Sequence, residues 1–169
     1  MGLTERPSKD DRFALTDYFI GDKNSIELTF EQYNELLAAR DLLLHTLQMD
    51  EKFFAASEHY RELEEYGFGV SLENLLYLRT DARAFYTVGF QFGRRLSALL
   101  TAVGLYIDSI VSHGRAITSG SVTDKEFKKL TSIEYDKSFD YRVMETLRNY
   151  VKHQGYPVHS TTFKHNRPK

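Results

Sequence analysis

The fold is decided by residues 81–114, DARAFYTVGFQFGRRLSALLTAVGLYIDSIVSHG. Apolar residues recur there at steps of three and four over about eight helical turns, at Phe85, Val88, Phe92, Leu96, Leu99, Val103, Tyr106 and Ile110. Gly89, Gly93 and Gly104 each cost roughly 1 kcal/mol of helix propensity relative to alanine. We therefore expect one long central helix that ends at Gly114, with a neighbouring helix lying close against its glycines.

The chain before this helix is expected to form a hairpin and a first helix. Two short apolar runs between Phe13 and Leu28 flank a turn, which favours a β-hairpin. Thr29 and Gln32 then form a capping box that opens a helix. Its apolar residues continue at helical spacing to Gly67, as one long helix or as two shorter ones.

Two further helices and a strand are expected after the central helix. A second capping box, Thr123 with Glu126, opens a short helix. Ser138 caps a final helix, which must stop before Gly155. Residues 158–163 are rich in β-branched side chains, and this composition predicts a strand that can pair with the N-terminal hairpin.

These patterns predict an all-α fold, an antiparallel helical bundle with minor β decoration at the termini. Residues 1–169 are expected to form a single domain. The polar residues 1–11 are expected to be disordered, and the basic residues 164–169 to form a frayed tail.

The composition is that of an ordinary soluble protein, with 41% hydrophobic, 14% aromatic and 27% charged residues. The chain has no cysteine, which excludes disulfides and agrees with a reducing, cytoplasmic location. The sequence contains no run of about 18 apolar residues, so we expect no membrane-spanning helix. A net charge of -2 means that any RNA contact must come from a local basic patch. We expect no cofactor and no metal.

Candidate chemistry lies at the end of the final helix, in LRNYVKH at residues 147–153. His153 is the side chain best suited to move protons near neutral pH. Arg148 can grip a phosphate through two hydrogen bonds and stabilise charge that develops in the transition state. Asn149 can orient either partner. These three residues suit metal-independent cleavage of a phosphodiester.

The same residues also have a plain structural interpretation. Cations at the end of a helix complement its negative dipole, and this alone explains Arg148 and His153. The spacing recurs at Arg40 and His45 on the first predicted helix, so spacing alone is a weak signal. Arg148 and His153 also lie about 140° apart around one helix. A second copy of the chain is therefore expected to complete any shared site.

Residues 147–153 followed by Pro157-Val158-His159 resemble the signature of the HEPN superfamily, an arginine, a polar residue and a later histidine on a late helix. Residues 92–103 are similar to the long core helix of bacterial members. The resemblance implies a metal-independent ribonuclease with a toxin–antitoxin or phage-defence role, and a homodimer with one composite site. Arg148, Asn149 and His153 would carry the catalysis, and an antitoxin or nucleotidyltransferase would be the partner.

The chain departs from the HEPN toxin pattern at one position. The tyrosine that such toxins place two residues after the histidine is replaced by Gly155, and Tyr156 follows it. The alternative function is a non-catalytic dimeric module that binds nucleotide, RNA or a partner protein.

Three other groups of residues are expected to have structural roles. Asp108, Ser112 and His113 are attributed to the end of a helix, and His59 with Glu62 to a charged face. The aromatic pairs Phe53-Phe54 and Phe85-Tyr86 are expected in the core.

Overall fold

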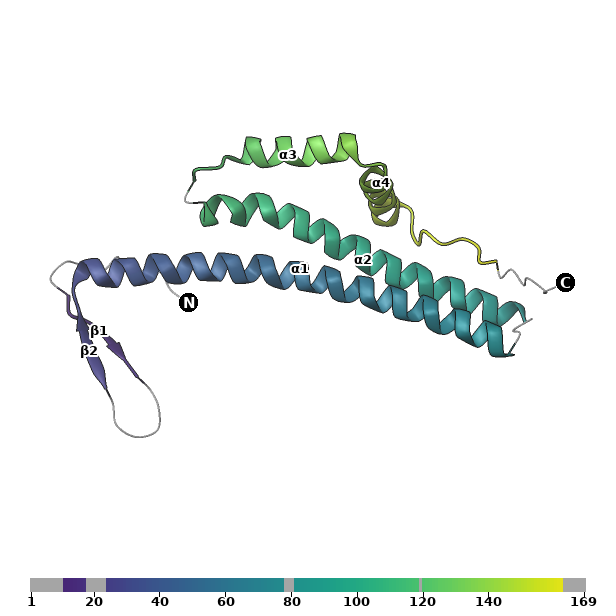
Figure 1. Ribbon diagram of the computed structural model, residues 1–169, viewed down its shortest axis with the longest axis horizontal. Helices are drawn as coiled ribbons and strands as arrows, with labels where there is room; N and C mark the ends of the chain where they lie inside the picture. Colours follow the sequence, from purple (N-terminus) through teal and green to yellow (C-terminus); the bar gives the residue numbers. More distant parts are fainter. Residues whose placement is uncertain (1–10, 18–23, 78–80, 119, 163–169) are drawn as a thin grey trace. The chain divides into compact units, whose positions relative to one another are not determined.

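The structure, a computed structural model, describes residues 11–17, 24–77, 81–118 and 120–162. These residues form a two-stranded sheet and four helices (Figure 1), namely β1 (Phe13–Thr16), β2 (Ser25–Leu28), α1 (Phe30–Tyr77), α2 (Ala82–Ile117), α3 (Asp124–Lys137) and α4 (Phe139–His153). The predicted all-α class with a small N-terminal β element is confirmed. The chain divides into two compact units, Met1–His45 and Thr46–Lys169, which are described separately.

The first unit contains the predicted hairpin. β1 and β2 pair antiparallel, with Phe13 opposite Leu28; most of the predicted turn lies outside the described residues. The predicted capping box is present, since the Thr29 N–H donates to the Gln32 side chain at 2.9 Å and the Gln32 N–H donates to the Thr29 hydroxyl at 3.2 Å. The Phe13 ring stacks on Tyr33 at 4.3 Å between centroids, which joins the hairpin to the first turns of α1.

The first helix is longer than predicted. α1 passes through Gly67, where the sequence predicted its end, and continues to Tyr77 as one helix. The Phe92 ring of α2 lies 3.6 Å from the place that a Cβ would take at Gly67. The Ser71 hydroxyl donates to the Gly67 carbonyl at 2.9 Å. Packing by a neighbouring helix and continued backbone hydrogen bonding thus outweigh the low helix propensity of glycine.

α2 supplies most of the core of the second unit. Every residue of its predicted apolar stripe is buried or half-buried, and the buried hydrophobic residues of the described chain are Val88, Leu99, Leu100 and Ala102 of α2 with Ala56 and Val70 of α1. Asp81 caps the helix by accepting from the Ala84 N–H at 2.7 Å. α2 runs beyond the predicted end at Gly114 to Ile117.

The glycines of α2 are where other parts of the chain come closest. A Cβ added at Gly104 would lie 2.5 Å from Nε of Arg148 on α4, and one at Gly114 would collide with the Phe127 ring on α3. At Gly93 the neighbour is the Cβ of Tyr156, at 3.2 Å, in the segment after α4. The predicted close approach of a helix is confirmed at Gly104; at Gly89 and Gly93 the segment after α4 takes that place, through Thr161 and Tyr156.

The C-terminal segment differs from its prediction. Residues 158–162 form no strand. They lie along α2, where the Thr161 hydroxyl donates to the Phe85 carbonyl at 3.4 Å, so the α2 surface rather than a sheet partner holds them. Residue 163 and the predicted basic tail lie outside the described residues, as do residues 1–10 of the predicted lead segment.

By length and hydropathy, α2 would be able to cross a membrane, since an 18-residue window within it has a mean hydropathy of 1.4. The core helix of a soluble protein meets the same criterion.

Two glycine-to-alanine substitutions test the packing at α2. Gly104→Ala gains roughly 1 kcal/mol of helix propensity, but its Cβ would force the Arg148 guanidinium out of place. We therefore expect a lower free energy of unfolding, measured by urea denaturation followed by circular dichroism. Gly69→Ala on α1 is the control, because a Cβ there meets no atom of the described chain within 4 Å. The free energy of unfolding of Gly69→Ala should equal or exceed that of the wild type. Equal stability of the two variants would contradict the packing argument.

Candidate functional site

The candidate site lies on α4, whose ends are fixed by local chemistry. Ser138 accepts a hydrogen bond from the Tyr141 N–H at 3.1 Å, as predicted for the cap. Lys152 and His153 stand in the last turn, where positive charge complements the helix dipole. Gly155 follows with φ +127, a backbone conformation that residues other than glycine rarely adopt. The chain therefore leaves the helix directly after the motif.

Arg148 is fixed between two helices. Its guanidinium donates to Glu145 on α4 at 3.1 Å and to Asp108 on α2 at 3.2 Å. The side chains of Arg148 and Glu145 are 29% and 24% exposed, whereas that of Asp108 is 66% exposed. The guanidinium also lies against Gly104. Two carboxylates thus hold Arg148 in one orientation and balance its positive charge.

Asn149 and His153 have a different environment. Both residues are exposed, and they stand four positions apart on one face of α4. In the described part of the chain, no hydrogen bond or ion pair joins either of them to Arg148. The structure therefore brings Asn149 and His153 to one solvent-facing surface, while Arg148 points toward α2.

The apolar face of α4 is only partly buried. Leu147, Tyr150 and Val151 are half-buried. Phe139 is 68% exposed, and Val143 is 38% exposed. The predicted core positions of Phe53, Phe54 and Tyr86 are wrong, since these residues are 54%, 64% and 75% exposed. The second unit therefore carries apolar surface on several helices.

The contact between Asp108 and Arg148 escaped the sequence analysis. Forty positions separate the two residues, and Asp108 was grouped with Ser112 and His113 on its own helix. Tyr141 lies beside the same cluster. Burial, with a smaller contribution from the Glu145 carboxylate, raises the pKa of Tyr141 above its ordinary value. No local pattern signals such a contact, because it depends on how α4 crosses α2.

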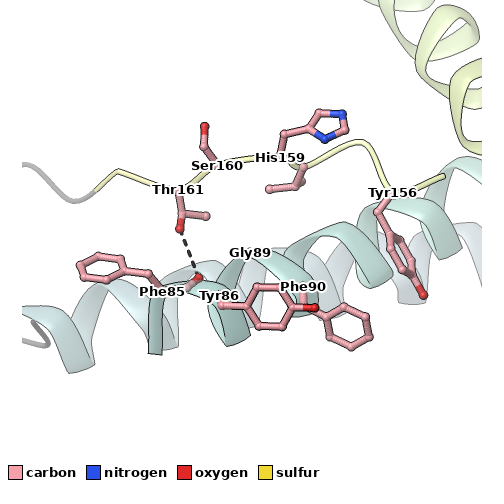
Figure 2. Close-up of a pocket in the computed structure, with 9 residues that line it drawn as sticks. Phe85, Tyr86, Gly89, Phe90, Tyr156, His159, Ser160 and Thr161 are labelled. Atoms are coloured by element: carbon pink, nitrogen blue, oxygen red, sulfur yellow. Dashed lines mark hydrogen bonds between the residues drawn. The ribbon is translucent and has the colours of Figure 1, made fainter. Parts of the chain in front are cut away.

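A second polar contact lies just after α4. The Tyr150 hydroxyl and Nε2 of His159 are 2.8 Å apart, and the two rings meet edge to face at 5.7 Å between centroids. His159 belongs to the wall of a pocket of about 370 Å³ between residues 156–161 and α2. Figure 2 shows the aromatic residues Phe85, Tyr86 and Phe90 on the α2 side of this pocket. Aromatic side chains of this kind can stack on nucleobases.

A larger pocket, of about 490 Å³, lies between α1 and α2. Small residues of α2, including Ala98 and Ala102, form part of its lining, and Lys52, His59 and Arg94 bring basic side chains to it. Nζ of Lys52 lies 3.4 Å from Nε2 of His113, and His59 pairs with Glu62 at 3.4 Å. The predicted charged face at His59 thus borders a partly apolar hollow.

The described residues contain no group of three or more histidine, aspartate or glutamate side chains that could hold a metal ion. Comparison with protein-family models, with curated proteins and with solved structures found no match. The resemblance to the HEPN superfamily therefore rests on the residues of the motif and its setting.

Replacing Arg148 tests whether it joins α4 to α2. Arg148→Met keeps the aliphatic stem but loses both ion pairs, and it leaves Glu145 partly buried without its cation. We expect a loss of about 1–2 kcal/mol in the free energy of unfolding. Solvent screens the exposed Asp108, so the ion pair with Asp108 contributes the smaller part of this loss. Urea denaturation measures it.

The matched control is Arg40→Met. The side chains of Arg40 and its ion-pair partner Asp41 are 64% and 59% exposed. We therefore expect little or no change in the free energy of unfolding. Equal effects of the two substitutions would show that Arg148 does not hold the helices together.

Proposed function

We propose that this chain is a HEPN-like, metal-independent endoribonuclease whose active site is completed across a homodimer. Arg148, Asn149 and His153 carry the reaction. The observation that supports this best is the placement of Asn149 and His153 on one exposed face of α4. The nearby Arg148 is held at a defined position by Asp108 and Glu145. A histidine that solvent reaches and an arginine of fixed orientation are what phosphodiester cleavage without a metal requires.

The reaction follows from the chemistry of RNA. His153 takes the proton of a ribose 2′-hydroxyl, whose oxygen forms a bond to the adjacent phosphorus. The bond from phosphorus to the 5′-oxygen breaks, and a water molecule donates a proton to that leaving oxygen. Arg148 stabilises the extra charge on the phosphate oxygens. The products are a 2′,3′-cyclic phosphate and a 5′-hydroxyl.

The need for a second copy follows from the geometry of α4. Arg148 points toward α2, and about 140° of helix separates it from His153. A second chain can bring its own Arg148 or His153 to the exposed face of the first.

The biological role in this proposal is that of a cytoplasmic toxin or phage-defence effector, with an antitoxin or nucleotidyltransferase as partner. Tyr156 is not placed like the tyrosine of HEPN toxins. It packs on Gly93 and meets the Phe90 ring at 5.4 Å between centroids, although it remains 47% exposed. We therefore propose inhibition by binding of the partner rather than modification at this position.

Cleavage of RNA by the purified chain tests the activity. In the presence of EDTA we expect products with 5′-hydroxyl ends, and a loss of at least about 100-fold in rate for His153→Ala, in line with removal of a general acid–base. The double variant Arg40→Ala/His45→Ala is the control, because it removes the same residue types at the same spacing from α1. Unchanged cleavage by His153→Ala would exclude this mechanism.

Mixing two inactive variants tests the composite site. If Arg148 of one copy works with His153 of the other, a heterodimer of Arg148→Ala and His153→Ala contains one complete centre. Co-expression of the two should then restore a measurable fraction of the wild-type rate. If each chain uses its own pair, neither chain of the heterodimer is complete and no activity returns.

The ion pairs of Arg148 favour a second candidate function, a non-catalytic dimeric module that binds nucleotide, RNA or a partner protein. A guanidinium balanced by Asp108 and Glu145 has less charge to offer a phosphate. RNA binding that survives His153→Ala, in a chain that shows no cleavage, would identify this alternative.

A further inference from the structure

The outward face of α1 in the second unit carries a row of side chains at seven-residue spacing. Leu47, Phe54, Arg61, Phe68 and Leu75 return to nearly the same face of the helix, with a drift of about 20° per step. The apolar members are 52%, 64%, 73% and 74% exposed. We refer to these five residues as the α1 stripe.

The α1 stripe lies on the side of α1 away from α2. The opposite side of the helix holds Ala56 and Val70, which are buried, and Tyr66, whose ring meets Phe92 of α2 at 5.0 Å between centroids. Large apolar side chains at this spacing on a solvent-facing side are typical of a helix that pairs with another helix. The stripe therefore needs a partner outside the described part of the chain.

The order of residues in the stripe identifies that partner. The stripe is the same in both directions from Arg61, with a phenylalanine seven residues away on each side and a leucine fourteen residues away. An antiparallel copy centred on Arg61 would place Leu47 opposite Leu75, and Phe54 opposite Phe68. A contact between identical surfaces requires such self-complementarity, whereas an unrelated partner does not.

The charged centre agrees with this register. Arg61 pairs with Glu58 and with Glu65, the latter at 2.8 Å, so its charge is balanced within its own helix. Two copies of Arg61 can therefore meet at a two-fold axis. Any other register would set this charged cluster against a leucine or phenylalanine, and a polar residue in an apolar seam fixes register in this way. Antiparallel helices also oppose their dipoles favourably.

The size of the stripe is near the lower limit for a specific contact. From Leu47 to Leu75 the helix rises about 42 Å and is about 10 Å wide, so two copies cover roughly 800 Å² before the flanking Leu72 and Leu76 are counted. These two residues are 44% and 62% exposed. The total approaches the roughly 1,000 Å² that a biological interface is expected to exceed.

From these observations we infer that the chain forms an antiparallel homodimer through the α1 stripe, with Arg61 at the two-fold axis. This contact goes beyond the composite site of the proposed ribonuclease, because it uses the side of α1 away from α2, whereas α4 packs on α2. The two contacts use different faces of the chain and can exist together.

Disulfide cross-linking tests the register, because the natural chain contains no cysteine. The double variant Leu47→Cys/Leu75→Cys should form a covalent dimer under mild oxidation, since the two cysteines face each other between copies. Within one chain they are about 42 Å apart, far beyond the reach of a disulfide. Each single variant should remain uncross-linked. Self-cross-linking of Leu47→Cys alone would indicate a parallel pair and overturn the antiparallel register.

The contact itself is tested by light scattering on the full chain. Leu75→Glu sets a carboxylate against Leu47 of the second copy, and we expect it to halve the molar mass at micromolar concentration. Leu130→Glu on α3 is the matched control, since Leu130 is 60% exposed outside the stripe, and should leave the mass unchanged. An unchanged mass for Leu75→Glu, or a wild-type chain that is monomeric, would overturn the proposal. Neither readout depends on RNA cleavage, so this proposal and the proposed function can fail separately.

Discussion

The packing of the second unit depends on three glycines of α2, which have no side chain. At Gly93, Gly104 and Gly114, a methyl group would collide with, or press on, the segment after α4, α4 itself and α3 respectively. The glycines lower the helix propensity of α2, and the long apolar stripe around them compensates for this cost. The close approach at Gly104 also brings the Arg148 guanidinium within hydrogen-bonding distance of Asp108. The same close packing of α4 on α2 therefore also sets the position of Arg148.

Features set by neighbouring residues were predictable from the sequence, and features set by distant contacts were not. The capping boxes at Thr29 and Thr123 depend on side chains three positions apart, and both form as predicted. The end predicted at Gly67 was wrong because α1 packs on Phe92 there. The strand predicted for residues 158–162 was wrong because that segment lies on α2. In both cases a tertiary contact outweighed the local preference.

The candidate site shows the same division. The motif places Arg148, Asn149 and His153 on the last helix, and the exposure of Asn149 and His153 follows from the polar side of α4. The two carboxylates that hold Arg148 depend on the crossing of α2 and α4, which the motif does not encode. This matters for the chemistry, because a guanidinium between two carboxylates is well oriented but carries less uncompensated charge. An incoming phosphate must compete with Asp108, the more exposed of the two.

Hydrophobic periodicity cannot separate a core from an interface, and α1 shows why. The same helical spacing that predicted a buried position for Phe54 leaves it 64% exposed, since burial on a partner and burial in a core produce the same pattern. What separates the two is the polar residue in the middle of the stripe. At a two-fold axis Arg61 would meet its own copy, and Glu58 and Glu65 of the same helix balance its charge there. Arginine within an otherwise apolar stripe is therefore the mark of a helix that pairs in a fixed register.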